Sequence, residues 1–488
     1  MIQKRGGTVF WILLAVFGAA VVVLLAVVLA KTITFKPKKS EQERPAPVYV
    51  NGEKAARDLA EMIRCKTVSS MDKTEEDERE FEKFEKLLPA LFPKIHEKCV
   101  FEKIGDRALL FRWRGKSAAS PTVLMSHYDV VSVVEENWQK PAFDGVIENG
   151  VLWGRGTLDT KGTLNAVLQA AETLIEEGFV PENDIYFAFG GDEEINGHGA
   201  KDIVKLFTER KITPGLVLDE GGAVVERVFP GVSRPCALIG IAEKGMLNVE
   251  YSVTGGGGHS STPAPKGPVF RLARACTRVE GKPFPFTLNT PALEMFNVLA
   301  RHSTFLYRML FANLWLFAPV LNLFTRLTGG ELNAMLRTTI AFTQMEGSKG
   351  INVIPPYAMM ASNHRIVPGD TVESSIERIR RTVADEKVEV SLINGTDPSR
   401  VSDVKCSAWD VVTSATAETW PEAIVSPYLM LACSDSRHWG VLSDKVYRFS
   451  AMALSKEERA TIHGNDERIP LSTISKSVEF YLRLMRKI

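Results

Sequence analysis

The sequence predicts an α/β protein with a mostly parallel sheet, an inserted ferredoxin-like α+β domain and one N-terminal transmembrane helix. Three observations support this prediction. Strand-like and helical apolar patterns alternate from about residue 50 to residue 242, which is typical of a parallel sheet. From residue 243 the order becomes strand, helix, two strands, helix and strand, as in a split βαβ unit. Ahead of both, residues 9–30 carry no charge.

The uncharged stretch at residues 9–30 predicts a membrane anchor that follows a short tail, residues 1–8. A helix that rises about 1.5 Å per residue crosses a hydrocarbon core of about 30 Å over this length. The alternative is a cleaved signal peptide with small residues at 28–30, although its apolar region would be unusually long. Basic residues flank both ends, so the charge pattern does not give an orientation.

Composition places the rest of the chain among globular proteins. With 488 residues and 45% hydrophobic residues, the chain can form about two or three domains with full cores. Lys+Arg and Asp+Glu balance at 59 each, and no basic stripe is interleaved with aromatic residues, so nucleic-acid binding is not expected. The six cysteines are scattered and form no metal or redox motif; disulfides are neither required nor excluded.

The elements of the first domain follow a charged, proline-containing linker at residues 31–48. The first part of this domain spans residues 49–242. Within it, the patterns predict helices at 52–65 and 75–91, strands at 108–113 and 122–125, a hairpin turn at 149–150 that returns at 151–153, a helix up to about 177, a strand at 185–189, a helix at 200–210 and a strand at 216–219.

The second domain is predicted at residues 243–393, as an insertion into the first. Strands are expected at 246–253, 338–344, 357–366 and 387–393, and helices at 269–279 and 371–384, with an apolar insertion around 296–330. The chain then returns to the first domain for residues 394–488 and closes with a helix at 472–485.

Polar side chains follow the predicted strands at the edge where open α/β sheets bind ligands. His127 follows one strand, and Glu193 and Glu194 follow another. Asp219 ends a third strand, and Asp159 precedes the long helix. With His463 these residues form a set of imidazoles and carboxylates without thiolates, which suits a pair of divalent ions such as Zn²⁺.

Each candidate can be given a role if the set holds two ions. Asp159 is the natural bridge, which leaves His127 with Asp219 for one ion and Glu194 with His463 for the other. Glu193 is then free to move a proton. Asp129, two residues after His127, can accept the other N–H of that imidazole. Taken singly, each signal is weak, because a lone histidine after a strand is more often structural and an acidic turn is usually solvated.

Considered together, these stretches resemble the aminoacylase, carboxypeptidase S and carboxypeptidase G family of di-zinc metallohydrolases, in metallopeptidase clan MH. The resemblance covers about residues 50–488 and is nearest to the carboxypeptidase S-like branch, which includes hydrolases of N-acyl amino acids. The matching stretches are residues 126–131, Gly154-Arg155-Gly156 with Asp159 and Lys161-Gly162, residues 192–194, Leu218-Asp219-Glu220-Gly221 and Ile462-His463-Gly464.

The resemblance implies further site residues and partners. The inserted domain would act as a lid and form a homodimer, and His259 in a Gly-His-Ser-Ser segment would stabilise the oxyanion in the partner subunit's site. Asn352 and Arg365 match positions that bind substrate, and a cis peptide is expected after Asp159. Two departures are a serine at 132, where relatives have proline, and residues 432–437, which replace a Gly-Gly-Thr-Asp segment. Substrate contacts expected in that altered segment are Ser434 and Arg437.

The function expected from the residues and the resemblance is hydrolysis of an amide bond. The substrate would be an N-acyl amino acid or a small peptide with a free carboxylate, and the cofactors two Zn²⁺, with Co²⁺ or Mn²⁺ as possible substitutes. Glu193 would be the general base, and the catalytic domain would lie on the extracytoplasmic side of the membrane. The alternatives are a dipeptidase or carboxypeptidase of the same family and a catalytically silent binding protein with the same fold.

The apolar stretch at residues 305–324 has two interpretations. One is a helical hairpin buried against the lid or a dimer interface, and the other is an exposed apolar surface that touches lipid or guides an acyl chain. A second transmembrane helix is not favoured, because the uncharged part is short and Pro319 interrupts it.

Overall fold

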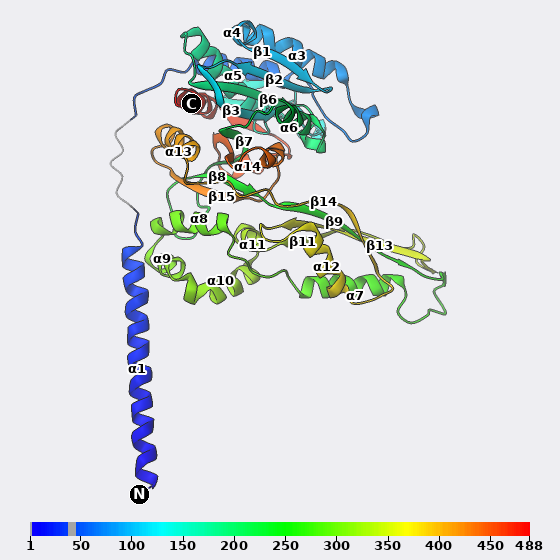
Figure 1. Cartoon of the computed structure of the whole chain (residues 1–488). Coiled ribbons are helices and arrows are strands. Elements are labelled where there is room, and N and C mark those ends of the chain that lie inside the picture. Colours follow the sequence, from blue (N-terminus) through cyan, green and yellow to red (C-terminus); the bar gives the residue numbers. More distant parts are fainter. Residues whose placement is uncertain (1, 38–44) are drawn as a thin grey trace.

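The computed structural model describes residues 2–37 and 45–488, and Figure 1 shows their arrangement. The largest element is an eight-stranded sheet with the order β1-β2-β6-β3-β7-β16-β8-β15. In this order the strands are β1 (Val100–Ile104), β2 (Ala108–Trp113), β6 (Asn183–Gly190), β3 (Ser117–His127), β7 (Leu216–Val225), β16 (Val446–Ala453), β8 (Cys236–Glu243) and β15 (Ile424–Met430).

The sheet is mixed, which corrects the expectation of a mostly parallel one. Strands β6, β3, β7 and β16 are parallel neighbours, as predicted. The edge pair β1 and β2 is antiparallel, and β2 runs antiparallel to β6. At the other side β8 returns antiparallel to β7, because no helix separates these two consecutive strands.

Helices cover both faces of this sheet. Alternate side chains of β3 enter two separate cores: Leu124 joins the larger core, whereas Val123 and Met125 join the smaller one. The smaller core is closed by α6 (Gly199–Glu209) and Trp439. The larger core is closed by α2 (Gly52–Ile63), α3 (Glu78–Leu91), α4 (Pro93–Lys98), α5 (Lys161–Glu176), α13 (Ser407–Thr419) and α15 (Leu471–Met485).

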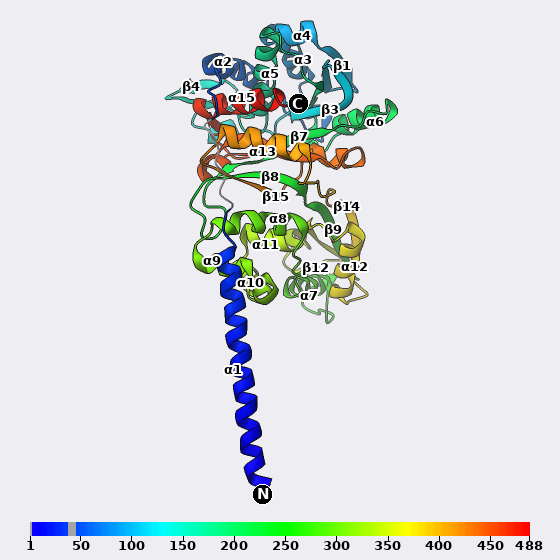
Figure 2. The same ribbon diagram turned by 60° about the vertical axis from the view of Figure 1, so that its left-hand side comes forward.

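A second sheet lies below the first in Figures 1 and 2, with the order β11-β13-β9-β14 and only antiparallel pairs. This is the strand order of the expected split βαβ unit. Together with α7 (Pro268–Gly281) and α12 (Val372–Val383) it encloses a core of its own. Its strands are β9 (Gly245–Thr254), β11 (Thr339–Glu346), β13 (Tyr357–Ile366) and β14 (Glu389–Thr396).

Two smaller sheets extend these units. Strands β10 (Gly258–His259) and β12 (Val353–Ile354) pair with each other. Strands β4 (Val146–Glu148), β5 (Val151–Trp153) and β17 (Arg468–Pro470) form a three-stranded sheet. The predicted hairpin joins β4 to β5, and its two turn residues, Asn149 and Gly150, both have positive φ. The short helix α14 (Lys456–Arg459) precedes β17.

The apolar insertion forms four helices that pack with the first sheet rather than with the second. They are α8 (Thr290–Leu299), α9 (Phe305–Ala312), α10 (Leu314–Thr328) and α11 (Gly330–Leu336). Helix α8 packs on β15, and Phe296, Phe311 and Leu321 belong to the larger core. The insertion is therefore attached to the first sheet although it interrupts the second domain in sequence.

Most of helix α1 (Ile2–Thr34) projects from the globular part, and its last turns contact α9 (Figure 1). Its segment Phe10–Thr34 is long and apolar enough to cross a membrane, and only 6% of its most apolar window is buried within the protein. The helix begins and ends a few residues beyond the predicted stretch 9–30. The predicted linker falls partly on residues 38–44, which lie outside the described residues.

A buried ion pair joins the neighbouring strands β16 and β8 of the first sheet, and its contribution to stability can be tested. Arg448 Nε on β16 lies 2.7 Å from Glu243 Oε1 on β8, and both side chains are 1% exposed. We expect Arg448→Ala to lower the free energy of unfolding by about 3–5 kcal/mol, because it leaves an uncompensated buried charge. Urea unfolding of the full chain in detergent measures this.

The matched control is Arg486→Ala, which removes a pair with Glu177 in which the side chains are 40% and 49% exposed. The control should lose less than about 1 kcal/mol. Equal losses in the two variants would contradict the assigned role of the buried pair.

Candidate metal centre

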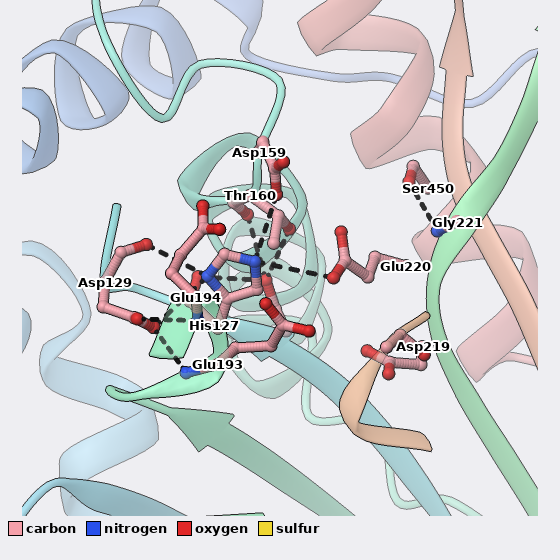
Figure 3. Close-up of polar contacts among 12 residues, drawn as sticks. His127, Asp129, Asp159, Thr160, Glu193, Glu194, Asp219, Glu220, Gly221 and Ser450 are labelled. Carbon is pink, nitrogen blue, oxygen red and sulfur yellow. Dashed lines mark hydrogen bonds and ion pairs between the residues drawn. The ribbon is translucent and has the colours of Figure 1, made fainter. Parts of the chain in front are cut away.

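The site forms where parallel strands β3 and β6 end next to each other. His127 is the last residue of β3, and the ladder pairs it with Gly190, the last residue of β6. The chain then turns through a short 3-10 helix that carries Glu193 and Glu194. The imidazole and both carboxylates therefore meet at one edge of the sheet (Figure 3).

Asp159 stands between two histidines from distant parts of the chain. Its Oδ1 lies 3.1 Å from His127 Nε2, and its Oδ2 lies 3.0 Å from His463 Nε2. The Asp159–Thr160 peptide is cis, as the family resemblance implied. A carboxylate that directs one oxygen at each of two imidazoles has the arrangement of a bridging ligand.

One further carboxylate accompanies each histidine. Glu194 Oε2 lies 3.1 Å from His463 Nε2. Glu220 Oε1 lies 3.5 Å from His127 Nε2, and Figure 3 shows the Glu220 side chain directed at that imidazole. The donors thus separate into two sets that share Asp159: His127 with Glu220, and His463 with Glu194.

The structure corrects the expectation that Asp219 accompanies His127. Asp219 lies apart from the cluster in Figure 3, with no dashed line to His127, and its Oδ2 accepts the backbone N–H of Ser436 at 2.9 Å. The predicted strand ends at Asp219, but β7 continues to Val225. Adjacent side chains of a strand point in opposite directions, so only one of the two consecutive carboxylates can face His127, and it is Glu220.

The donor set fits two divalent cations. Ligands about 2.0–2.1 Å from a tetrahedral ion lie about 3.3 Å from one another, close to the distances between these imidazole nitrogens and carboxylate oxygens. Burial and the neighbouring Asp159 raise the pKa of Glu220 to about 8. Hydrogen bonds to Asp159 and Glu194 raise the pKa of His463 to about 10. Both raised pKa values follow in part from an excess of negative charge in the cluster, which bound cations would balance.

Glu193 stands beside the cluster and has no ion-pair partner of its own among the described residues. Its carboxylate, His127 and Glu220 place donor atoms within 4.8 Å of one another. Burial, together with the charges of Glu220 and Asp435, raises the pKa of Glu193 well above its usual value. The neighbouring Asp192 faces elsewhere, since its Oδ2 accepts the backbone N–H groups of His198 and Gly199, at the start of α6.

Asp129 fixes both His127 and the acidic turn. His127 Nδ1 lies 3.0 Å from the backbone oxygen of Asp129 and 3.4 Å from its Oδ1. The expected contact therefore exists, but the main-chain oxygen is the nearer acceptor. The Asp129 carboxylate accepts the backbone N–H groups of Glu193 and Glu194, each at 3.1 Å, and the Ser69 hydroxyl at 2.7 Å.

A buried ion pair that the sequence reasoning did not identify holds the other two ligand loops. Glu467 is fully buried, and its Oε1 accepts the backbone N–H groups of Gly156, Leu158 and Asp159. Its Oε2 lies 2.7 Å from Arg155 Nη1, and Arg155 Nη2 donates to the backbone oxygen of Gly464 at 2.7 Å. Arg155 lies within a stretch that resembles the family, and Glu467 lies three residues after another such stretch. Their positions in the sequence could therefore have indicated a role at the site.

Three of the predicted substrate residues, Ser434, Arg437 and Arg365, lie in or beside the loop that follows β15. Ser434 is fully buried, and its N–H and hydroxyl both donate to Glu243, so it is not available to a substrate; this corrects the expectation. Arg365 on β13 donates to Cys433 Sγ at 3.3 Å. Arg437 Nε donates to the backbone oxygen of Ser434 at 2.8 Å. Burial alone would lower the pKa of Arg437, but the negative charges around it, among them Glu243, Glu193 and Asp435, raise it.

His259 and Asn352 do not join the metal cluster of their own chain. His259 lies on β10, is exposed, and places Nδ1 2.8 Å from Ser261 Oγ. Asn352, just before β12, is also exposed, and its backbone oxygen accepts the N–H of Ser260 at 3.1 Å. Figure 2 draws β12 beside α7, away from β3 and β7.

Comparison with known families gives one match that covers most of the chain. Residues 123–487 match peptidase family M20/M25/M40. The matched region begins within β3 and ends in the last residues after α15, so it contains all the candidate ligands described above.

Two relatives of this chain carry names that indicate different activities. The chain is 35% identical to the "Probable carboxypeptidase S-like 2" of Dictyostelium discoideum, over 95% of this chain and 92% of that protein. It is 34% identical to the "N-fatty-acyl-amino acid synthase/hydrolase PM20D1" of Xenopus tropicalis, over 97% of this chain and 94% of that protein.

Among solved structures, an M20 family metallo-carboxypeptidase, Sso-CP2 from Sulfolobus solfataricus, has a similar fold. Its TM-score is 0.66, at 17% sequence identity, and the match covers 88% of this chain and 98% of that one.

Substitutions at the adjacent residues Glu220 and Asp219 test the ligand set. Glu220→Gln removes a candidate ligand, and we expect it to lower metal affinity by at least about 10–100-fold, the range measured when only an outer partner of a ligand is lost. The matched variant Asp219→Asn should retain metal, because its side chain faces Ser436. Metal analysis after dialysis against graded chelator measures both; loss in Asp219→Asn alone would contradict the assignment.

The pKa values predict proton release on metal binding. In the metal-free protein, Glu220 and His463 titrate at about 8 and about 10, so near neutral pH both carry protons that a cation must displace. Apparent zinc affinity should therefore rise as pH increases from about 6 to about 8. Calorimetric titration in two buffers with different ionisation enthalpies measures the release; a heat independent of the buffer would contradict it.

Proposed function

The chain belongs to peptidase family M20/M25/M40, a family of hydrolytic enzymes, and we propose that it hydrolyses the amide bond of N-acyl amino acids at a two-zinc centre. The observation that carries this proposal is Asp159, which directs one oxygen at His127 and the other at His463. Each histidine has one further carboxylate beside it, and Glu193 remains free of the two sets.

Zinc is the proposed metal because the donors are imidazoles and carboxylates. His127, Asp159 and Glu220 would hold one ion, and Asp159, Glu194 and His463 the other. Co²⁺ or Mn²⁺ could replace zinc at such donors. When bound, the ions supply a polarised carbonyl and an acidified water.

Glu193 is the proposed general base. It takes a proton from the attacking water and passes it to the leaving nitrogen of the amide. Its position is set through the main chain, because the Asp129 carboxylate accepts the N–H of Glu193 and that of the ligand Glu194. The base and one metal ligand are thus held by the same side chain, which also touches the ligand His127.

Arg365 and Arg437 are the proposed partners of the substrate carboxylate. A guanidinium group binds a carboxylate through two parallel N–H donors. Arg437 Nε donates to the backbone oxygen of Ser434 at 2.8 Å, and Arg365 contacts the preceding residue, Cys433. A substrate held there by its carboxylate would present its amide to the metal edge.

His259 and Asn352 are proposed to act in the site of a partner subunit. Both are exposed on the β10–β12 extension of the second domain and make no contact with the metal cluster of their own chain among the described residues. The second domain would then be a lid and dimerisation domain, and His259 would stabilise the oxyanion that forms during attack.

The proposed location is a membrane, with α1 as an uncleaved anchor and the catalytic domain on the extracytoplasmic side. The support is the exposed apolar surface of α1, where residues such as Phe10, Leu13 and Val22 are 60%, 62% and 65% exposed. Such a surface is stable in hydrocarbon rather than in water.

A carboxypeptidase or dipeptidase is the second candidate, because one of the relatives above is named carboxypeptidase S-like. A substrate panel separates the two. We expect faster hydrolysis of long-chain N-acyl amino acids than of N-acetyl amino acids or dipeptides, measured as kcat/KM for the full-length protein. Preference for dipeptides would favour the second candidate.

Glu193→Gln tests the proposed chemistry. We expect it to keep both metals but to lower kcat by about 10²–10⁴-fold, because it removes the proton carrier and leaves both donor sets intact. The matched control Asp192→Asn changes the adjacent carboxylate, which faces the start of α6, and should retain most activity. Similar losses in both variants would argue against a specific role for Glu193.

A further inference from the structure

We propose that helices α9 and α10 form a shallow membrane-binding platform that lies in the lipid surface beside α1. The inference rests on the proposed anchoring of the chain through α1. It goes further, because it assigns a lipid contact to a part of the globular domain and fixes which face of that domain meets the bilayer.

The platform exposes large apolar side chains on one side. Leu306 on α9 is 70% exposed, and Leu327 at the end of α10 is 76% exposed. Between them Trp315, Leu323 and Phe324 are 55%, 59% and 52% exposed. Large apolar side chains exposed together on two consecutive helices indicate an interaction site rather than ordinary solvent-facing surface.

The opposite side of the same helices is fixed to the protein core. Phe311 is buried, with its ring centroid 4.8 Å from that of Phe229 and 4.9 Å from that of Phe296. Leu321 on α10 is 2% exposed. The outward side therefore cannot turn inward, and its exposure is a stable property of the fold.

Neither helix alone is long enough to cross a bilayer, and the sharp bend between them favours an in-plane position. They are bent by 111° at the break between them. Helix α10 has 15 residues and so extends about 22 Å, less than the hydrocarbon core of about 30 Å. An amphipathic helix of this kind lies at the boundary between headgroups and acyl chains.

Contacts with α1 place the bend at the membrane boundary. Asn313, at the break between α9 and α10, is fully buried, and its Nδ2 lies 3.2 Å from Thr32 Oγ1 and 3.3 Å from the backbone oxygen of Val28. Lys31 Nζ lies 5.3 Å from the ring centroid of Trp315. The uncharged stretch of α1 ends at residue 30, so the bend meets α1 where its apolar stretch ends (Figure 1).

The charges of this region suit an anionic lipid surface. From residue 295 to residue 330 the charged side chains are Arg301, Arg308 and Arg326, and the stretch contains no Asp or Glu. Basic residues around an apolar helix face strengthen binding to anionic headgroups. A second copy of this chain is a poorer occupant, because a two-fold contact would bring these arginines near their own copies with no acidic residue of the stretch to balance them.

Site-specific photo-crosslinking to lipid tests the platform. The full-length protein is reconstituted in phosphatidylcholine vesicles that contain a minor fraction of phosphatidylserine. A diazirine side chain replaces Leu306 or Leu327 on the platform, Val22 on α1, or Ile147 on β4, which is 42% exposed on the first domain. Labelled lipid bound to each variant is then measured.

We expect labelling at Leu306 and Leu327 to approach that at Val22 and to exceed that at Ile147 by at least about tenfold, as expected for groups that insert below the headgroups. Labelling of Val22 with Leu306 and Leu327 at the level of Ile147 would overturn the platform and leave the anchor intact. An unlabelled Val22 would instead overturn the anchor, and the platform would then stand only if Leu306 and Leu327 were labelled.

A double substitution, Leu323→Asp with Leu327→Asp, provides a second readout. It should reduce hydrolysis of long-chain substrates held in vesicles several-fold and leave hydrolysis of a soluble N-acetyl substrate unchanged, because the metal edge is untouched. If the double variant hydrolyses both substrates as fast as the unchanged protein does, the platform is contradicted. Loss of the soluble activity as well would show that these residues act through the fold, and would contradict it too.

Discussion

Several carboxylates are held close together at one buried edge of the first sheet, and their mutual repulsion is the main constraint on the site. Asp159, Glu194 and Glu220 all approach the two histidines, and Glu193 stands beside them. Like charges at this separation destabilise one another unless cations or protons intervene. The surroundings hold the carboxylates in place: Glu467 fixes the Asp159 loop, and Asp129 fixes the turn that carries Glu193 and Glu194. A protein without a use for cations would gain nothing from this arrangement.

Sequence reasoning identified the parts of the site that follow from strand ends and failed where the side-chain direction decides. His127 and the acidic turn come directly after apolar runs, and parallel strands bring such ends to one edge. Asp219 and Glu220 are adjacent on β7, so their side chains point in opposite directions and only one of them can face His127. The sequence alone does not show which one it is. The sequence predicts Ser434 as a substrate contact, because the composition of a loop does not show that its side chain turns inward to Glu243.

The fold shows the same division. The periodicity of apolar residues predicts the four strands of the second sheet and β2, β3, β6 and β7 of the first, because each buries a continuous or alternating apolar face. Strands β1, β8, β15 and β16 of the first sheet were not predicted. The mixed direction of the first sheet was not predictable in the same way, since it depends on the direct return of β7 into β8. The partner of the apolar insertion was not predictable either, because hydrophobicity shows that a segment is buried or bound but not what covers it. Phe311 packs in the larger core, whereas Leu306 on the same helix faces outward.

We propose that the cluster around Asp159 holds two metal ions and that hydrolysis requires them. Metal analysis and X-ray absorption spectroscopy of the purified full-length protein, combined with an amide hydrolysis assay, test it most directly. We expect about two zinc ions per chain at a separation of about 3.5–4 Å, loss of hydrolysis on chelation and recovery on adding zinc. A single ion per chain, or hydrolysis that survives complete removal of metal, would contradict it.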